Sequence, residues 1–307
     1  MLKYRENNKI LKTLKPKTGI INAILDTDTF NEIDDQFALV QMLFSKKRIN
    51  TLSINAAPFS MNSRSDDPQT GMELSYDEII RLLEKINFKK NNFVFKGSKE
   101  YVGFEKKPIN SPAADNIIES ALKYSEDDPL YIIAIGAITN VASAILKEPE
   151  IINKIVVVWL GGNALYWPNN DEFNLKQDIG GSQVLFDSGV SLILVPCKGV
   201  TSHLISTVPE IEKYIEPQGK IGEFLAMRFK EYNNNHKGWS KEIWDMAAIS
   251  WVLNEEWAPT NIVPSPILLD NKNWAFDENR HPVKIVYEIK RDLILQDFIE
   301  KLENFSK

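Results

Sequence analysis

The chain has 307 residues, of which 43% are hydrophobic and 25% charged, and its net charge at pH 7 is -6. This is the composition of a soluble globular protein, and no linker, low-complexity tract or fixed-period repeat divides it. An acidic chain without clustered lysines and arginines excludes most nucleic-acid binding, because phosphate contacts need a basic face. We expect one domain over 1–307, with 1–18 as an N-terminal extension.

The first residues and the single cysteine bear on location. Residues 1–19 hold no apolar segment of signal-peptide length, and the apolar runs, such as IVVVWLGG, are too short to span a membrane. Cys197 has no partner for an internal disulfide and ends an apolar run, where a buried structural thiol is expected. The sequence predicts a cytoplasmic protein with no membrane role.

Short β-branched runs alternate with amphipathic helical patterns along the chain. Strands are expected over 21–26, 50–57, 130–136, 154–162 and 191–197, and helices over 34–44, 76–86 and 140–148. The last third is more helical, with helices over 221–232 and 244–253 before a strand and helix within 283–302. Continuous apolar strands between such helices indicate an α/β fold, with a mostly parallel sheet covered by helices on both faces.

Polar, compact segments follow three of the predicted strands. DTDTFNEIDD (the acidic loop, 26–35) follows the first strand, IGAITN follows YIIA, and LGGN, with DEFN a little further on, follows IVVVW. Ligands of open α/β sheets bind at the carboxyl ends of the strands. The three segments together therefore predict a binding site for a small polar ligand or a cation.

The acidic loop gathers four aspartates and a glutamate. Asp26 and Asp28 flank Thr27 at a strand end, so we expect their side chains to point the same way and to chelate one cation. Asp34 and Asp35 come at a helix start, where either one alone is explained by capping. The group needs more than capping, because like charges repel unless a cation lies between them.

Carboxylate ligands favour a hard cation. Calcium takes six to eight oxygen ligands in irregular geometry, and magnesium is the alternative. Zinc prefers nitrogen and sulfur ligands, and the chain has only four such residues, not in ligand spacing: His203, His236, His281 and Cys197. A haloacid dehalogenase-type phosphatase also begins with a strand and D-x-D, but Phe30 stands where that class has a small residue, and no later Gly-Asp pair follows.

Five motifs in order, ILDTDTFNEIDD, AIGAITNVA, WLGGN, EFN and WDMAA, resemble those of the calcium-dependent nucleoside hydrolases, the inosine-uridine hydrolase family. The resemblance runs from about residue 20 to the C-terminus. It implies an open Rossmann-like sheet and cleavage of the N-glycosidic bond of ribonucleosides, by a calcium-activated water, to ribose and free base. It also implies a homodimer or homotetramer.

The same resemblance implies a role for each motif residue. The calcium ligands would be Asp28, Asp35, Asp245 and the backbone carbonyl of Ile135, and Asp28 would also be the general base. Glu172 and Asn174 would bind the 5′ and 3′ hydroxyls of the sugar. Asp34 would hold ribose hydroxyls, and Asn163 would be a further sugar contact. These types suit the reaction, because carboxylates stabilise an oxocarbenium-like sugar and calcium both orients the ribose diol and activates water.

Two departures from the family pattern stand out. The usual loop is D-x-D-P-G-x-D-D, whereas the acidic loop is two residues longer and holds Asn31 and Glu32 in the extension. We expect Glu32 to be a solvated loop residue, with a sugar or metal contact as the alternative. Trp244 stands where many relatives have the histidine that protonates the leaving base, and it is expected either to stack on a purine or to belong to the core.

Two other polar residues have open roles. His236 is an alternative leaving-group acid, although a solvated histidine explains its surroundings as well, and Arg64 is expected to be a solvated surface residue. The predicted function is a calcium-dependent ribonucleoside hydrolase that leans towards purines because of Trp244. The alternatives are an N-ribosyl hydrolase of altered specificity, and a non-catalytic, calcium-dependent nucleoside or ribose binding protein.

Overall fold

The computed structural model describes residues 5–306, so residues 1–4 of the expected N-terminal extension, and residue 307, lie outside the described part. The first described helix is α1 (Asn7–Thr13), which packs beside strands β6 (Ser191–Val195) and β12 (Pro282–Val286). Just before it, Arg5 Nη1 donates a hydrogen bond of 2.8 Å to Ser191 Oγ. The described part of the extension therefore packs on the sheet.

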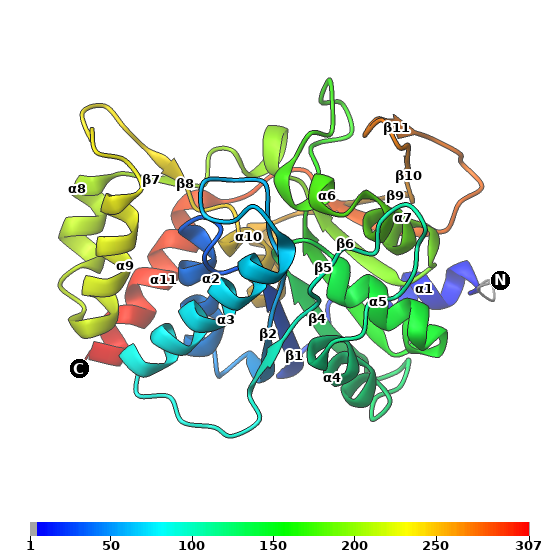
Figure 1. Ribbon diagram of the computed structural model, residues 1–307, viewed down its shortest axis with the longest axis horizontal. Helices are drawn as coiled ribbons and strands as arrows, with labels where there is room; N and C mark the ends of the chain where they lie inside the picture. Colours follow the sequence, from blue (N-terminus) through cyan, green and yellow to red (C-terminus); the bar gives the residue numbers. More distant parts are fainter. Residues whose placement is uncertain (1–4, 307) are drawn as a thin grey trace.

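An eight-stranded sheet runs through the molecule in the order β3-β2-β1-β4-β5-β6-β12-β9 (Figure 1). Its other strands are β1 (Ile21–Thr27), β2 (Ile49–Ala56), β3 (Val94–Lys96), β4 (Leu130–Ala134), β5 (Ile155–Leu160) and β9 (Thr260–Pro264). All neighbours pair in parallel except β9, which runs antiparallel to β12 at the edge. The predicted α/β fold with a mostly parallel sheet is confirmed.

Helices cover both faces of the sheet (Figure 1). One face carries α2 (Asp34–Phe44), α3 (Pro68–Lys85), α9 (Gly219–Glu231), α10 (Met246–Leu253) and α11 (Arg291–Ser306). The other carries α4 (Pro112–Ala121), α5 (Thr139–Lys147) and α7 (Ile179–Asp187). Alternate residues of β5 enter the two cores, Val156 and Val158 on the first side and Val157 and Trp159 on the second, which is why this strand is apolar throughout.

Two of the differences from the predicted elements concern α3, which starts earlier because of its capping residues, and β9, which is an additional strand at the edge of the sheet. Helix α3 begins eight residues before the predicted 76–86 because Asp67 caps it, accepting from Thr70 N at 2.9 Å, and Pro68 occupies the first turn. Strand β9 was not predicted, because an edge strand is half exposed and has no continuous apolar run.

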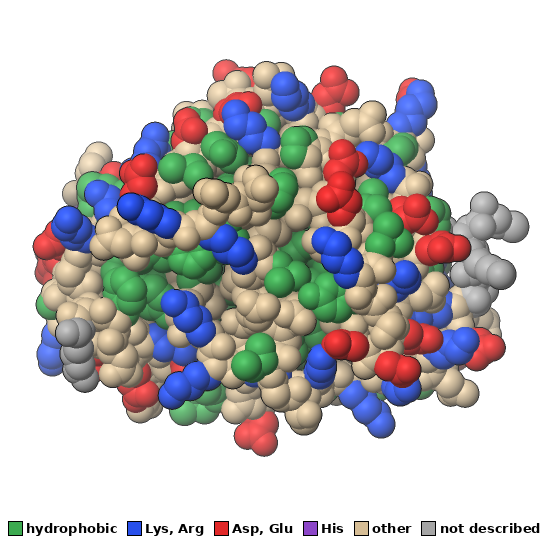
Figure 2. All heavy atoms as spheres, turned by 90° about the horizontal axis from the view of Figure 1, so that it is seen from below, with side chains coloured by type: hydrophobic (Ala, Val, Ile, Leu, Met, Phe, Trp, Pro, Cys, Tyr) green, Lys and Arg blue, Asp and Glu red, His purple; other side chains and the backbone are tan. Residues whose placement is uncertain are grey.

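The remaining elements are short. They are α6 (Phe173–Gln177), α8 (Val208–Glu210), the paired strands β7 (Ile205–Ser206) and β8 (Lys241–Glu242), the paired strands β10 (Ile267–Leu268) and β11 (Trp274–Ala275), and helical turns at Pro149–Asn153, Cys197–Thr201, Ile211–Ile215 and Glu255–Trp257. On the face shown in Figure 2, basic and acidic side chains are interspersed. Within residues 5–306, no helix has the length and apolar character needed to cross a membrane.

Candidate active site

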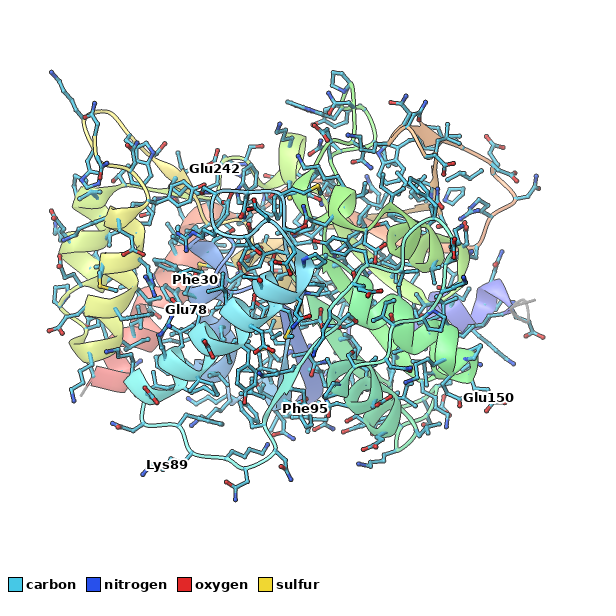
Figure 3. All side chains as sticks on the ribbon, viewed as in Figure 1. Phe30, Glu78, Lys89, Phe95, Glu150 and Glu242 are labelled. Atoms are coloured by element: carbon cyan, nitrogen blue, oxygen red, sulfur yellow. The ribbon has the colours of Figure 1, made fainter. Side chains whose placement is uncertain are left out.

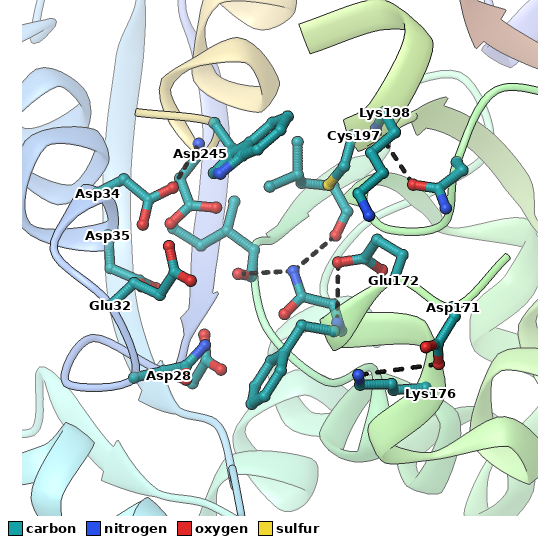
Figure 4. A pocket seen from close by; sticks show the side chains of 17 residues that line it. Asp28, Glu32, Asp34, Asp35, Asp171, Glu172, Lys176, Cys197, Lys198 and Asp245 are labelled. Atoms are coloured by element: carbon teal, nitrogen blue, oxygen red, sulfur yellow. Dashed lines mark hydrogen bonds and ion pairs between the residues drawn. The ribbon is translucent and has the colours of Figure 1, made fainter. Parts of the chain in front are cut away.

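A cavity of about 230 Å³ opens at the carboxyl ends of the strands, beside the point where the strand order reverses between β1 and β4 (Figure 4). Ligand sites of open α/β sheets lie at such switch points. The nine residues to which the sequence analysis gave a site role from the family motifs all line it: Asp28, Asp34, Asp35, Ile135, Asn163, Glu172, Asn174, Trp244 and Asp245. The fold thus brings the five motifs together, whereas the roles of these residues stay predictions.

One side of the cavity, the acidic wall, consists of Asp28, Glu32, Asp34, Asp35 and Asp245 (Figure 4). Three of these acids are buried and offer carboxylate oxygens within 4.8 Å of one another: Asp34, Asp35 and Asp245. Asp34 and Asp35 open α2, whose start has no side-chain cap, and Asp245 comes directly before α10. Two hydrogen bonds hold the group, from Thr27 Oγ1 to Asp35 Oδ1 (2.5 Å) and from Asp245 N to Asp34 Oδ2 (3.3 Å).

Asp28 lies on the same wall but outside this group of three. Its side chain is buried, and its Oδ2 has no hydrogen-bond partner among the described residues. Gly136, which follows β4, makes room for it, because a Cβ there would lie 2.8 Å from Asp28 Oδ1. A buried carboxylate oxygen without a donor is costly unless a ligand supplies the missing contact.

Burial raises the pKa of each buried acid in this wall. For Asp28 and Asp245 the pKa lies well above its ordinary value, because neighbouring carboxylates add to the effect of burial. Burial raises the pKa of Asp34 to about 8 even though the Lys241 charge lowers it, and it raises that of Asp35 to about 6 against the hydrogen bond from Thr27. A set of hard oxygen donors that repel one another fits a hard divalent cation, so this wall could hold a metal ion.

Asp26 does not join this wall. Its carboxylate accepts a hydrogen bond of 3.0 Å from Asn140 Nδ2 and lies outside the cavity lining, and burial raises its pKa to about 7. The expectation that Asp26 and Asp28 chelate one cation is wrong, because β1 ends at Thr27 and the period of two does not continue through Asp28.

The opposite wall consists of Asn163, Asp171, Glu172, Asn174, Lys176 and Lys198 (Figure 4). Glu172 is buried there as the N-cap of α6 and accepts three backbone hydrogen bonds, from Gly162 N (2.7 Å), Asn174 N (2.9 Å) and Leu175 N (2.9 Å). Burial raises the pKa of Glu172, and these donors oppose the rise. Its Oε1 accepts only one of the three bonds and keeps capacity for a ligand.

The amides of this wall are also partly engaged. Asn174 Nδ2 donates to the carbonyls of Ile135 (3.2 Å) and Leu160 (3.0 Å), which leaves its Oδ1 for a ligand. Asn163 Nδ2 donates to a backbone carbonyl at 3.0 Å, and its Oδ1 accepts from Lys198 N at 3.2 Å. The Ile135 carbonyl, predicted as a cation ligand, is therefore held in place by Asn174.

The cavity is also lined by eight residues to which the family resemblance gave no role: Asn31, Glu32, Leu160, Asp171, Phe173, Lys176, Cys197 and Lys198. Lys176 lies 3.8 Å and Lys272 2.7 Å from Asp171 Oδ1. Cys197 and Lys198 follow β6, so the rule that polar segments after strands form the site would have found them. Cys197 is buried, as expected, and burial raises the pKa of its thiol well above the ordinary value.

The expectation that Glu32 is a solvated loop residue holds only in part, because 34% of its side chain is exposed while its carboxylate is paired. Lys241 Nζ lies 2.5 Å from Glu32 Oε2, and Tyr232 Oη donates to Glu32 Oε1 at 3.3 Å. Only 7% of the Lys241 side chain is exposed. The extension of the acidic loop therefore contacts β8. The sequence did not predict this contact, because the two residues are far apart along the chain.

Arg64 is not a free surface side chain either. Its guanidinium lies 4.4 Å from the centre of the Phe30 ring, and its Nη1 donates to the Phe30 carbonyl at 3.0 Å. Arg228 lies 5.2 Å from the same ring and forms two hydrogen bonds of 2.7 Å to the buried Glu78. Figure 3 shows Phe30 and Glu78 close together. Two guanidiniums thus fix the apolar residue of the acidic loop.

Trp244 fits both interpretations of its role. It is half-buried, packs against the first core and also lines the cavity. None of the three histidines lines the cavity, and His236 Nε2 lies 2.9 Å from the Lys230 carbonyl. A histidine acid for the leaving base is therefore absent from the cavity wall of the described residues.

A mostly parallel sheet with buried carboxylates at its switch point defines an α/β protein with a polar ligand site. The family profile described as inosine-uridine preferring nucleoside hydrolase matches residues 69–296. The chain therefore belongs to this family of nucleoside hydrolases, and the predicted resemblance is confirmed. The matched range begins after the acidic loop, where the sequence departs from the family pattern.

Individual relatives agree with this family. The non-specific ribonucleoside hydrolase RihC of Salmonella paratyphi A is 23% identical over 256 residues, which cover 78% of this chain and 81% of the relative. A plant nucleoside hydrolase, PpNRh1, has a TM-score of 0.73 and 19% identity, covering 92% of this chain and 99% of its own. A purine-preferring ribonucleoside hydrolase from Gardnerella vaginalis has a TM-score of 0.72 and 19% identity, covering 93% and 99%. The two solved structures share the fold.

Proposed function

We propose that the protein hydrolyses the N-glycosidic bond of ribonucleosides to ribose and free base, using a bound calcium ion. The observation that carries the proposal is the acidic wall, where Asp34, Asp35 and Asp245 place carboxylate oxygens within 4.8 Å of one another. Family membership and the non-specific ribonucleoside hydrolase RihC among the relatives support it.

The cation would be held by Asp28, Asp35, Asp245 and the Ile135 carbonyl, with Asp34 close by. All of these are oxygen donors, and the unpartnered Asp28 Oδ2 is the kind of atom that an ion completes. When bound, a calcium ion would offset the negative charge, bind neighbouring hydroxyls of ribose and increase the acidity of a water molecule.

Asp28 is the proposed general base. Its carboxylate takes a proton from the attacking water, through the oxygen that does not face the ion, while the water oxygen bonds to C1′ of the sugar. The bond between C1′ and the base nitrogen breaks, and its electron pair leaves with the base. General-base assistance of this kind contributes roughly 10²–10⁴-fold to the rate.

The sugar would lie between the two walls. Asp34 would accept hydrogen bonds from ribose hydroxyls on one side, and Glu172 Oε1, Asn174 Oδ1 and, less directly, Asn163 would do so on the other. As the base leaves, the ring gains positive charge, which the fixed carboxylates around it stabilise.

Trp244 is proposed to stack on the leaving base, which favours purines because their ring area is larger. With no histidine in the cavity wall, the departing base would take its proton from solvent. We further expect a cytoplasmic enzyme that forms a homodimer or homotetramer, as the resemblance implies, and sedimentation of the purified chain would measure this state.

The direct test is the release of reducing sugar from inosine, guanosine, adenosine, uridine and cytidine. We expect turnover that is abolished by chelation, restored by calcium and highest with the purines. Calcium-dependent ribose binding without release of base would instead favour the non-catalytic binding protein. Turnover that is unaffected by a chelator would reject the role of the ion.

The lysines of the opposite wall favour a second candidate, an N-ribosyl hydrolase that acts on ribosyl compounds carrying an anionic group. Lys198 has no carboxylate within 4.0 Å among the described residues, and Lys176 reaches Asp171 only at 3.8 Å. Nucleoside 5′-monophosphates assayed beside the nucleosides would separate the two, since this candidate requires a higher kcat/KM with the phosphorylated compounds.

A further inference from the structure

Lys241 is a buried ammonium directly behind the acidic wall. Its side chain is 7% exposed, and its Nζ lies 2.5 Å from Glu32 Oε2, 3.8 Å from Glu242 Oε2 and 5.1 Å from the centre of the Tyr232 ring. A lysine is rarely buried unless it is paired. Lys241 does not line the cavity, whereas its partner Glu32 does.

Phe30, Asn31 and Glu32 of the acidic loop are each held by a different distant partner. Arg64 Nη1 donates to the carbonyl of Phe30 at 3.0 Å, and Asn62 Nδ2 donates to Oδ1 of Asn31 at 2.6 Å. Glu32 is held by Lys241. The extension is therefore a fixed part of the cavity wall, with one carboxylate that faces the same space as the other acids (Figure 4).

The ion pair also joins the two segments that supply the acidic wall. Lys241 comes four residues before Asp245, and Glu32 comes two residues before Asp34. Beside the ion pair, Asp245 N donates to Asp34 Oδ2 at 3.3 Å. Lys241 thus fixes the carboxylate of Glu32 where the two segments meet.

The ionised form of Glu32 accepts hydrogen bonds and cannot donate them. Lys241 occupies Oε2, and the contact of Tyr232 with Oε1 is long at 3.3 Å, so Oε1 keeps capacity for another donor. A nucleoside offers hydroxyl and N–H donors to such an atom.

We propose that Glu32 is a substrate-positioning residue, which accepts a hydrogen bond from the nucleoside, and that Lys241 acts through Glu32 by holding it against the cavity. The inference rests on the proposed function and adds to the family pattern a contact made by the loop extension. Lys241 itself does not touch the substrate.

The test compares E32Q, K241M, K241R and the double variant E32Q/K241M. With inosine, E32Q and K241M should each raise KM about 10-fold, as loss of a charge-assisted hydrogen bond does, with a smaller effect on kcat.

K241R should recover most of the loss, because it keeps the charge. The double variant should be little worse than K241M, because the direct hydrogen bond of Lys241 in this wall goes to Glu32, and both K241M and the double variant remove the lysine charge that acts on Asp34. K147M, which removes the surface pair of Lys147 with Asp115 (2.6 Å), is the matched control and should leave KM unchanged.

A second readout separates this inference from the function on which it rests. Binding of formycin A, a nucleoside with a carbon-carbon glycosidic bond that resists hydrolysis, is measured by calorimetry with calcium present. E32Q and K241M should weaken it by a similar factor, even if no ribonucleoside is turned over. The inference would be overturned if the effects of the two substitutions multiplied in the double variant. It would also be overturned if the variants lost only thermal stability while KM and formycin affinity stayed at wild-type values.

Discussion

The two walls of the cavity bury carboxylates in opposite ways. Glu172, on the opposite wall, receives three backbone hydrogen bonds, from Gly162, Asn174 and Leu175. Asp28, on the acidic wall, has one oxygen with no partner, and further carboxylates lie on the same wall. Burial raises the pKa of both acids. Three backbone donors oppose the rise at Glu172, whereas at Asp28 neighbouring carboxylates add to it and one backbone N–H opposes it.

This difference separates a carboxylate that stabilises the fold from one that awaits a ligand. The donors around Glu172 belong to the start of α6, so its charge is compensated whether or not a ligand is present. The protein compensates the charge of Asp28 only through a backbone N–H, and its Oδ2 has no partner among the described residues. The group of three has the hydrogen bonds from Thr27 and the backbone and, near Asp34, the charge of Lys241. Because Glu172 and Asp28 are both buried, their exposed fractions alone would not show which of them has its charge compensated.

The largest expected effect comes from removing the charge of Asp28. D28N should lower kcat with inosine by about 10²–10⁴-fold, because it removes the general base. Its thermal midpoint in chelator should be equal to or above that of the wild type, since one repelling charge is gone. A D28N enzyme with wild-type kcat would show that the unpartnered carboxylate has no catalytic role.

Calcium should stabilise the wild type and not a variant that lacks one of the proposed ligands. At a calcium concentration of 100 Kd, binding should raise the free energy of unfolding by about 2.7 kcal/mol. D245N should lose most of this response. The thermal midpoint, measured with chelator and with added calcium, tests it; an equal midpoint shift in D245N would place the ion elsewhere.

Trp244 lines the cavity and directly precedes Asp245, and its removal should affect bases unequally. W244A should lower kcat/KM for inosine by roughly 5- to 150-fold, the equivalent of about 1–3 kcal/mol of stacking, and should lower that for uridine less. W244F keeps an aromatic face and is the matched control. Equal losses with both substrates would assign Trp244 to the core alone.

On the opposite wall, E172Q should cost stability in addition to weakening the proposed sugar contact. The amide that replaces one carboxylate oxygen cannot accept from the backbone N–H groups of α6, so we expect a loss of about 1–3 kcal/mol in the free energy of unfolding. Urea denaturation measures this loss, and D28N is the comparison. The contrast between the walls would fail if E172Q were as stable as the wild type.

The smallest effect is a pH dependence of the metal-free protein. The pKa of Asp34 is raised from its ordinary value to about 8 in the folded state, so the folded state binds more protons, and stability is lost as the pH rises towards 8. We expect a loss of roughly 1–2 kcal/mol between pH 6.5 and 8 in chelator, and a flatter profile for D34N. The lowered pKa of His281, about 4, acts in the opposite direction but only below about pH 6.5.

Patterns within one segment predicted much of this structure. The continuous apolar runs gave the central strands, the helix over 34–44 matches α2, and the polar segments after three strands all reach the cavity. These features depend on local periodicity and on the geometry of parallel sheets. The cap of α3 by Asp67 and Pro68 was also visible in the sequence, and it was overlooked because the segment is polar.

Contacts between segments that are distant along the chain could not be predicted from the sequence. The pair of Glu32 with Lys241 joins residues 209 positions apart, and the stacking of Arg64 on Phe30 depends on how two loops meet. Asp26 was misplaced because strand alternation was extended one residue past the end of β1. Side-chain partners of this kind follow from the tertiary arrangement, which one sequence does not specify position by position.

Calorimetric titration of calcium into the chelator-treated protein tests the function of the acidic wall most directly. The wild type should bind one ion per chain, D245N should bind it far more weakly, and E172Q should bind it with nearly wild-type affinity once folded. If the wild type takes up no calcium, or D245N binds it as tightly as the wild type, the acidic wall is not the ion site and the proposed mechanism is wrong.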